Sequence, residues 1–465
     1  MSEPSRAAWA SGPVAALVVG GGLLLAGMPL PAALTGAITA FCAAWWAAEP
    51  IPLAATALLP FGLLPLLGII DAKSAAAAYG DPVVLLMLGG FLLSAMVEHS
   101  GAHERLAVGL VRFASGRSGR FLVVAFMLAT GFVSMWISNT ATTLVMMPVG
   151  LALISQDERH RGGPSPLAAP LVLGIAYASS IGGIGTPVGT PPNLIFAAVL
   201  ERAGQEPWSF LRWMGLGVPV VAVLLPLAAL WLSRHLGKER VGAVPVQAAW
   251  RPRELRTIAI FGVTALLWMT RTAPFGGWSG LTGLTGADDG SVALMAVFLA
   301  LVLPNGEGGR LLTWKQAERV PWGLLILFGG GIAIARAFEA SGFSAAIGDG
   351  LANELALEAW PYALLAFVLA LSVSLISEFT SNTATASLLL PILATAALAA
   401  GLEPAALMLP ATIGASASFM LPAGCASNAI AYGTGLVPSR VMIREGIVLD
   451  VLGAVVAAGV CALLL

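Results

Sequence analysis

The same polar motif, Ser-Asn-Thr followed by Ala-Thr, occurs twice in this chain, at residues 138–142 and 381–385. Each copy lies inside a long apolar stretch that runs on to a proline, Pro148 or Pro391. Polar groups among apolar residues are costly unless they bind something. These side chains offer hydroxyl and amide oxygens without a fixed charge, which suits a small cation. Two copies in matching halves therefore indicate one binding site built from two related arms.

The helix ends at each motif would add to this chemistry. A helix that ends there leaves carbonyl groups without partners, and the helix that follows begins with unpaired N–H groups. The carbonyl end attracts a cation, and the N–H end attracts an anion. One short turn can therefore hold Na⁺ beside a carboxylate. The alternative, that the motif only caps helices at a surface turn, does not explain why it occurs twice before a helix break.

A break rich in Gly and Pro follows each motif, at residues 185–193 and 421–428. No helix can pass intact through the Gly-Thr-Pro-Val-Gly-Thr-Pro-Pro-Asn sequence of the first break. Asn193 and Asn428 end the two breaks, and they either cap helices or hold the two arms together. Glu378 precedes the second motif, and it is either a proton carrier or a partner of a local amide or hydroxyl group.

The composition is that of an integral membrane protein. Hydrophobic residues make up 58% of the 465 residues and charged residues only 10%, whereas soluble chains carry about 25% charged residues. The chain has room for roughly ten to twelve membrane-spanning helices. A net charge of −1 gives no sign of a nucleic-acid partner. No nucleophile–base pair, phosphate-binding loop or zinc motif occurs, so neither an enzyme nor an organic cofactor is expected.

The order of the apolar spans indicates an internal duplication. As one helix, residues 121–155 would be about 52 Å long, too long for a hydrocarbon core of ~30 Å, so this stretch must bend at the motif. Amphipathic pieces at 102–116 and 342–357 are expected to lie along the membrane interface. The spans are expected at 12–29, 31–47, 51–70, 82–98, 121–137, 141–155, 168–186, 194–203 and 210–233, and then at 257–271, 291–304, 321–338, 361–379, 384–400, 404–420 and 443–465.

Charge places the N-terminus in the cytoplasm of a multi-pass protein of the cell membrane. Most Lys and Arg residues then fall in loops on the inner side, at 101–120, 156–161, 234–256 and 305–319. Five spans lie between the two bent hairpins. Because five is an odd number, the hairpins open to opposite sides, as in an inverted repeat.

Several motifs together resemble the divalent anion:sodium symporter family, whose members move di- and tricarboxylates or sulfate. The resemblance extends over nearly the whole chain, and paired Ser-Asn-Thr motifs are highly specific. The matching segments are 45–53, 81–91, 136–142, 189–193, 378–385 and 419–422.

The resemblance implies an all-α polytopic fold of two inverted repeats, with about eleven transmembrane helices and two re-entrant hairpins. It also implies a homodimer, in which a scaffold domain dimerises and a transport domain slides past it as an elevator. The corresponding segments are 12–116 for the first scaffold helices with their surface helix, 117–233 for the first transport half, 234–256 for a cytoplasmic linker, 257–358 for the second scaffold helices and 359–465 for the second transport half.

The resemblance also implies site residues, several of which act through backbone carbonyls. The first Na⁺ site would use Ser134, Ser138, Asn139 and Gly189. The second Na⁺ site would use Ser377, Thr380, Asn382 and Gly424. The substrate carboxylates would meet Asn139, Thr140, Thr190, Asn382, Thr383 and, at the second break, Cys425.

Cys425 marks a departure from the family pattern. Where the second arm usually has Thr-Pro-Pro-Asn, this chain has Cys-Ala-Ser-Asn at 425–428. A thiol is a weaker donor than a hydroxyl, and the rigid prolines are absent. We therefore expect this break to be more flexible and its pocket less polar.

The resulting hypothesis is Na⁺-coupled symport of a small dicarboxylate such as succinate, malate or fumarate. In this hypothesis Na⁺ is a co-transported ion, and the partners are the dicarboxylate and the lipid bilayer. Exchange of carboxylates, H⁺ coupling through Glu378, and transport of another divalent anion such as sulfate stay open as alternatives.

Overall fold

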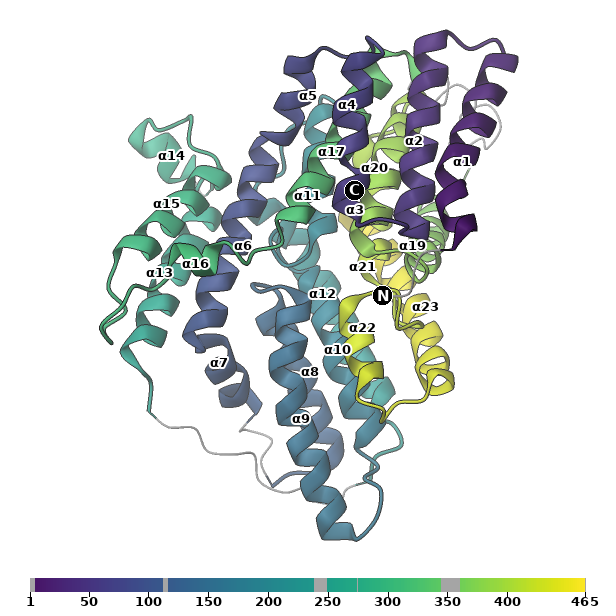
Figure 1. Cartoon of the computed structure of the whole chain (residues 1–465). Coiled ribbons are helices and arrows are strands. Elements are labelled where there is room, and N and C mark those ends of the chain that lie inside the picture. Colours follow the sequence, from purple (N-terminus) through teal and green to yellow (C-terminus); the bar gives the residue numbers. More distant parts are fainter. Residues whose placement is uncertain (1–4, 112–115, 238–248, 274, 344–359, 465) are drawn as a thin grey trace.

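The computed structural model describes residues 5–111, 116–237, 249–273, 275–343 and 360–464, and in these residues the chain is built from α-helices (Figure 1). A lone antiparallel bridge joins Pro304 and Arg310. The predicted all-α polytopic fold is confirmed.

The first half contains twelve helices within the described residues. They are α1 (Arg6–Leu25), α2 (Leu30–Ala48), α3 (Leu53–Thr56), α4 (Leu58–Leu66), α5 (Ala72–Tyr79), α6 (Pro82–Ser100), α7 (Ala102–Val111), α8 (Gly119–Ser134), α9 (Asn139–Arg161), α10 (Ala168–Gly183), α11 (Pro191–Arg202) and α12 (Phe210–Leu232).

The second half repeats much of this order. Its described helices are α13 (Pro252–Met269), α14 (Gly277–Thr282), α15 (Asp289–Val302), α16 (Trp314–Ala317), α17 (Trp322–Ala340), α19 (Tyr362–Ser377), α20 (Asn382–Ala399), α21 (Pro404–Ser416), α22 (Ala426–Gly433) and α23 (Ser439–Leu464). Most of the predicted surface helix at 342–357, and much of the linker at 234–256, lie outside the described residues.

The helix breaks lie where the polar motifs predict them. The first motif separates α8 from α9, and the second separates α19 from α20. The two Gly/Pro-rich breaks separate α10 from α11 and α21 from α22.

One predicted span is wrong in detail. Residues 51–70 form two short helices, α3 and α4, which meet at Ala57. The carbonyl oxygen of Ala57 accepts a hydrogen bond of 2.5 Å from the Tyr79 hydroxyl, and Gly330 packs closely against the same backbone. This outside partner is specific to the tertiary structure, and the local sequence gives no sign of it.

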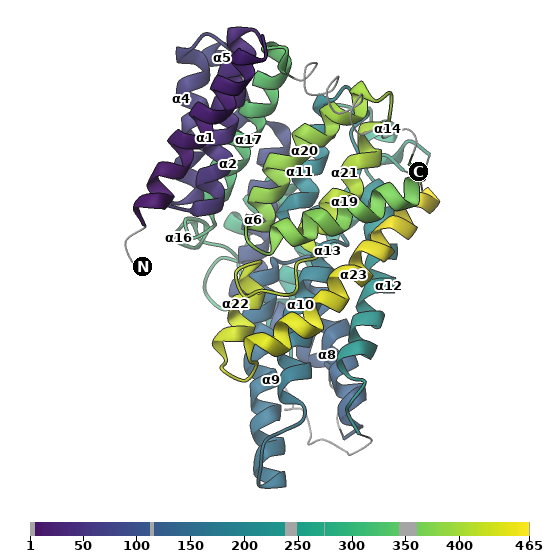
Figure 2. The ribbon, with the colours of Figure 1, turned by 90° about the vertical axis from the view of Figure 1, so that its right-hand side faces the viewer.

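The helices pack in two groups (Figures 1 and 2). In one group α17 packs against α2, α3, α4, α5 and α6, while α1 packs on α2 and α15 packs on α6 and α13. In the other, α10 contacts α8, α9, α12 and α22, while α19 and α21 each contact α20 and α23, and α11 packs on α20 and α21. This grouping is compatible with the predicted scaffold and transport segments, but that division stays a prediction.

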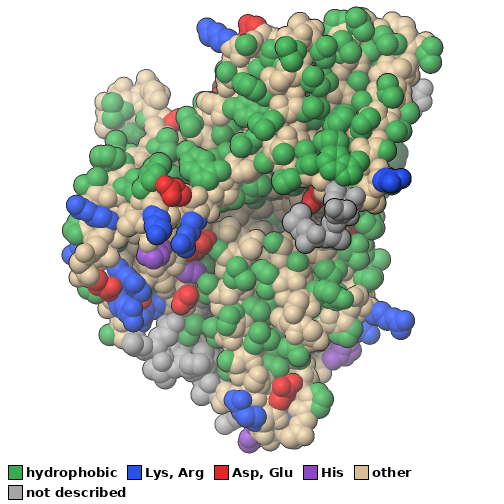
Figure 3. Space-filling view, viewed as in Figure 1, with side chains coloured by type: hydrophobic (Ala, Val, Ile, Leu, Met, Phe, Trp, Pro, Cys, Tyr) green, Lys and Arg blue, Asp and Glu red, His purple; other side chains and the backbone are tan. Residues whose placement is uncertain are grey.

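The surface agrees with a membrane environment. Seven helices in the described residues are long and apolar enough to cross a bilayer, and six shorter apolar helices accompany them. Large apolar side chains point outward, as at Leu17 and Leu25 of α1, which are 76% and 92% exposed. Figure 3 shows a broad apolar surface over the upper helices and a group of Lys and Arg side chains over α13 and α16. A multi-pass membrane protein is thus confirmed, whereas eleven spans stay a prediction.

Candidate functional site

The serine of each polar motif caps the helix that follows it. Ser138 Oγ accepts the N–H of Ala141 at 3.3 Å, and Ser381 Oγ accepts the N–H of Ala384 at 3.1 Å. The capping interpretation is therefore correct for the serines. It leaves Asn139 and Asn382, the first residues of α9 and α20, free to point elsewhere.

In the first arm, Asn139 packs against the end of α10. Ser134 Oγ lies 2.9 Å from Asn139 Oδ1 and donates to the carbonyl of Ser179 at 2.7 Å. A Cβ on Gly183 would lie 2.5 Å from Asn139 Oδ1, and a Cβ on Gly189 would lie 2.5 Å from the Gly183 carbonyl oxygen. Only glycine leaves room for this approach, so the first arm brings Ser134, Asn139 and Gly189 together.

In the second arm, Asn382 faces a cluster of oxygens. Its amide lies 2.9 Å from the Gly424 carbonyl oxygen, 3.0 Å from Ser377 Oγ, 3.1 Å from the Ala415 carbonyl oxygen and 3.2 Å from Ser418 Oγ. The amide NH₂ turned toward these atoms donates to them. With the amide oxygen turned inward, the same place is surrounded by oxygens alone, which is the ligand set that a hard cation such as Na⁺ requires. The residues present therefore fit a cation.

The Thr380 hydroxyl has local hydrogen-bond partners, whereas a role in the second Na⁺ site was predicted for this residue. Its hydroxyl pairs with the Thr385 hydroxyl at 2.5 Å and donates to the Ile376 carbonyl at 3.1 Å. The Thr380 side chain is thus engaged within its own turn. That side-chain identity matters less at this position stays a prediction.

Asn193 and Asn428 fasten the two helix breaks, a role that neither sequence alternative described. Asn193 Nδ2 donates to the carbonyls of Gly183 at 2.9 Å and Thr186 at 2.7 Å. Asn428 Nδ2 donates at 3.1 Å to the corresponding carbonyls, of Ser418 and Leu421. Each asparagine closes its own break, so the two breaks have the same geometry.

Three hydroxyl groups join the two arms to each other. Thr143 Oγ1 lies 2.8 Å from Ser179 Oγ and 3.0 Å from Ser427 Oγ, and the two serine oxygens lie 2.9 Å apart. All three residues are buried. Beside them, Cys425 Sγ lies 3.6 Å from Ser180 Oγ. The second break has Ala426 and Ser427 where the first has Pro191 and Pro192. Ser427 nevertheless anchors it to the first arm, and whether this break is more flexible stays a prediction.

These contacts bring four helix N-termini together. The first residues of α9 and α11 both lie near Gly183, α20 begins beside Gly424, and α22 begins beside the hydroxyls of the first arm. From this centre α9 and α22 run to one side and α11 and α20 to the other (Figure 2). Positive dipole ends thus surround one place, which suits an anion. The starts of α9, α20 and α22 also bring N–H groups there, whereas α11 begins with two prolines and adds only its dipole. The helix C-termini of α8, α10, α19 and α21 bring carbonyl groups to the same place.

The predicted substrate residues lie at these N-termini with different exposure. Thr140 is exposed, Cys425 is half-buried, and Thr190 and Thr383 are buried. Thr140 and Thr383 are the second residues of α9 and α20, while Thr190 and Cys425 are the N-cap residues of α11 and α22.

Several residues in contact with the site were missed by the sequence reasoning. Ser179 and Ser427 carry no local signal, because their partners lie in distant parts of the chain. Ser418 occupies the place of Gly183 in the other arm, and alignment of the two halves on Asn193 and Asn428 would have found it.

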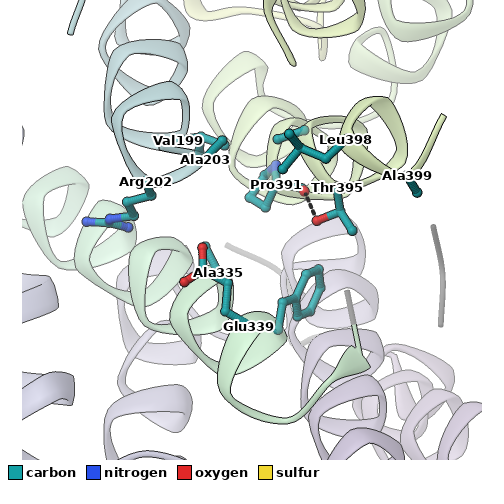
Figure 4. Close-up of a pocket in the computed structure, with 11 residues that line it drawn as sticks. Val199, Arg202, Ala203, Ala335, Glu339, Pro391, Thr395, Leu398 and Ala399 are labelled. Carbon is teal, nitrogen blue, oxygen red and sulfur yellow. Dashed lines mark hydrogen bonds between the residues drawn. The ribbon is translucent and has the colours of Figure 1, made fainter. Parts of the chain in front are cut away.

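A separate cavity of about 360 Å³ lies between α11, α17 and α20 and contains none of the predicted site residues. Figure 4 shows Arg202 of α11 and Glu339 of α17 opposite Pro391 and Thr395 of α20. This cavity therefore belongs to the packing between helices, not to the predicted binding site.

Comparison with known proteins shows similarity to anion transporters. Residues 43–414 match the family model described as citrate transporter, CitMHS. The sodium-dependent dicarboxylate transporter SdcS of Staphylococcus saprophyticus is 36% identical over 440 residues, which are 90% of this chain and 83% of the relative. The protein of the same name from Staphylococcus aureus is 35% identical over 443 residues, with the same coverage. The crystal structure of the Alcanivorax borkumensis YdaH transporter matches with a TM-score of 0.60 at 17% identity, over 94% of this chain and 97% of that chain, which shows the fold alone.

Proposed function

The chain belongs to the citrate transporter family, within the divalent anion:sodium symporters, and from this premise we propose that it is a Na⁺-coupled symporter of small dicarboxylates. It is not an enzyme. Succinate, malate and fumarate are the substrates that the proposal favours. The sodium dependence and dicarboxylate specificity in the names of the two SdcS relatives support it.

The observation that carries the proposal is the oxygen cluster around Asn382 beside converging helix N-termini. The oxygens of Ser377, Ala415, Ser418 and Gly424 offer a place for a cation. The N–H groups at the start of α9, α20 and α22, together with the positive dipole end of α11, offer a place for carboxylates. The second arm would hold one Na⁺, and the first arm, through Ser134, Ser138, Asn139 and Gly189, would hold another.

Coupling follows from charge. No Lys or Arg belongs to the predicted site, so a dicarboxylate there would be neutralised mainly by bound Na⁺. Na⁺ binds first and orders the two motifs, and the anion then binds beside the cations. An anion crossing without Na⁺ would leave negative charge uncompensated in a low-dielectric passage, which is costly.

Crossing by an elevator motion completes the proposal. The group of helices around α10 and α21 would move as a transport domain against a scaffold that includes α2, α6 and α17. The two halves would form inverted repeats, two subunits would pair through their scaffolds, and the N-terminus would lie in the cytoplasm.

The test is uptake of labelled succinate into liposomes that contain the purified protein. An inward Na⁺ gradient should drive accumulation, and an equal K⁺ gradient should not. Uptake that ignores Na⁺ but requires internal dicarboxylate would replace symport by exchange. Uptake that follows an imposed pH gradient instead would replace Na⁺ by H⁺.

A further inference from the structure

Two buried carboxyl groups hold the backbone of the second helix break. Glu378 Oε1 accepts the N–H of Met420 and Oε2 accepts that of Leu421, each at 2.7 Å. Asp450 Oδ1, from the middle of α23, accepts the N–H of Phe419 at 3.0 Å. Residues 419–421 follow the end of α21, and carboxyl oxygens from two other segments bind the N–H groups of all three. Hydrogen bonds to charged acceptors are stronger than those between neutral groups.

The two carboxyl groups bind neighbouring residues of the same loop. Glu378 and Asp450 are both fully buried, and they accept the N–H groups of the consecutive residues Met420 and Phe419. The second Asp450 oxygen, Oδ2, has no hydrogen-bond partner within the described part of the chain. In that same part, no Lys or Arg forms an ion pair with either residue. Buried acidic residues without a basic partner need a reason to be there, and among the described residues the donors that bind them are the N–H groups of the break.

The first arm does without such a pair. Met135 follows Ser134 as Glu378 follows Ser377, so an apolar thioether replaces the carboxyl group. In the first break the N–H groups of Ile184 and Gly185 bond to backbone carbonyls within the same turn, at 3.2 Å and 2.9 Å.

Asp450 has an apolar counterpart as well. Gly217 packs against the Ile184 carbonyl as Gly446 packs against the Phe419 carbonyl, and the residues four positions later are Val221 and Asp450. The architecture of a broken helix therefore does not require the two carboxyl groups, and their presence in one arm calls for a separate role.

That role is indicated by the short distance from the pair to the predicted cation ligands. A Cβ on Gly424 would lie 3.0 Å from Glu378 Oε2 and 3.1 Å from Ser418 Oγ. The N–H of Gly424 bonds to the Leu421 carbonyl at 3.2 Å, and Leu421 is itself held by Glu378. The Gly424 carbonyl and Ser418 hydroxyl face Asn382. The carboxyl pair and the second cation site therefore both contact the same loop, residues 419–424.

We propose that Glu378, backed by Asp450, is a positioning residue for the second cation site, which it serves by fixing the loop 419–424 so that the Gly424 carbonyl faces Asn382. Neither carboxyl group binds the cation itself. This inference rests on the proposed Na⁺-coupled function. In the second arm the two carboxyl groups bind the N–H groups of the break, as backbone carbonyls do in the first arm.

The first test is Glu378→Gln, with Met135→Leu as the matched change in the first arm. The Gln amide keeps one acceptor but turns an NH₂ group toward a backbone donor. The loss of one of the two hydrogen bonds to the loop, with a buried N–H group left unpaired, should raise the Na⁺ concentration for half-maximal succinate uptake by roughly tenfold. The maximal rate at saturating Na⁺ should stay within about twofold, because bound Na⁺ restores the loop. Met135→Leu should leave the half-saturation concentration unchanged.

Cys425 supplies a readout that does not depend on transport. It is half-buried beside Gly424, whereas the other two cysteines, Cys42 and Cys461, are fully buried. In Glu378→Gln without Na⁺, a maleimide should label Cys425 severalfold faster than in the unmodified protein, and saturating Na⁺ should reverse the increase. The Met135→Leu protein should label at the unmodified rate.

Each contrary result has its own meaning. An unchanged half-saturation concentration in Glu378→Gln would overturn the inference. A raised concentration with unchanged Cys425 labelling would also overturn it, because Glu378 would then act by its charge alone. If Glu378→Gln does not elute as a folded protein, Asp450→Asn gives the same comparison through Phe419. A lack of Na⁺ dependence in the unmodified protein would instead contradict the proposed symport, while Cys425 labelling would still test whether the pair fixes the loop.

Discussion

At the scale of single residues, each polar motif divides its work between neighbouring side chains. Ser138 and Ser381 cap helices, so they set where α9 and α20 begin. Asn139 and Asn382 then face the serine of the preceding helix, Ser134 or Ser377. Asn139 and Asn382 are the first residues of α9 and α20, and each supplies the amide group of its arm.

Replacing either asparagine by alanine should therefore strongly weaken the Na⁺ dependence of coupled uptake. Asn139→Ala or Asn382→Ala removes one cation ligand and leaves the facing oxygens unpaired. A hydrogen bond to a charged group contributes about 1.5–3 kcal/mol, so we expect the Na⁺ half-saturation concentration to rise roughly 10- to 100-fold. The measurement is Na⁺-dependent succinate uptake in liposomes. Thr395→Ala, in the separate cavity on α20, is the control, and equal uptake by all three variants would refute the assigned sites.

A substitution at Cys425 should strengthen succinate binding instead of weakening it. Cys425→Thr puts a hydroxyl donor at the N-cap of α22, where the family pattern has threonine. A neutral hydrogen bond contributes about 0.5–1.5 kcal/mol, so the succinate half-saturation concentration should fall about two- to tenfold. Uptake titrations with succinate measure this effect. Weaker succinate uptake by the variant would indicate that the thiol suits a different anion.

At the scale of helices, the close approach of α8 and α10 depends on glycine. Gly182 of α10 lies against the backbone of Gly131 in α8, and a Cβ there would lie 2.7 Å from Gly131 Cα. Small residues allow helix backbones to approach closely in membrane proteins. This contact fixes the end of α10 beside the first arm.

The positions of the helix breaks could be predicted from the sequence, but much of what holds them could not. The Ser-Asn-Thr motifs and the Gly/Pro runs leave strong local signals, because capping and helix termination depend on neighbouring residues. Ser427 bonds to Thr143 across 284 positions of the chain, and Asp450 lies in an otherwise apolar span. Such contacts depend on the tertiary arrangement, which local patterns do not report.

Gly182→Ala should destabilise the protein. The added methyl group meets the backbone of α8, which cannot move like a flexible side chain, so the expected loss is about 1–3 kcal/mol in the free energy of unfolding. Thermal unfolding of the purified protein in detergent measures the loss. Gly21→Ala on α1, where a Cβ would meet nothing within 4 Å, should be neutral. Equal melting temperatures for the two variants would contradict the packing described here.

At the scale of the whole molecule, a largely buried ion pair connects the two groups of helices. Arg202 at the end of α11 pairs with Asp81 at the start of α6 at 2.5 Å, with side chains only 14% and 12% exposed. Arg202 also donates to the Ile332 carbonyl of α17 at 3.3 Å. If the groups slide past each other, as proposed, these contacts must break.

Asp81→Asn should therefore cost stability, because it leaves the Arg202 charge buried without its partner. Breaking a fully buried pair costs about 3–5 kcal/mol, and the loss here should be smaller because both side chains are partly exposed. Addition of Arg202→Gln should recover part of that loss, with a coupling energy of about 0.5–3 kcal/mol. The measurement is a double-mutant cycle of unfolding in detergent. Strictly additive losses would mean that the pair does not join the two groups.

The central claim is that a cation and a dicarboxylate occupy adjacent places where the two arms meet. Equilibrium binding of labelled succinate to the purified protein, measured over a range of Na⁺ concentrations, tests this claim most directly. Adjacent binding predicts that Na⁺ increases succinate affinity, and that succinate increases Na⁺ affinity by the same factor, since coupling between two ligands is reciprocal. Succinate affinity that does not change with Na⁺ would contradict the account.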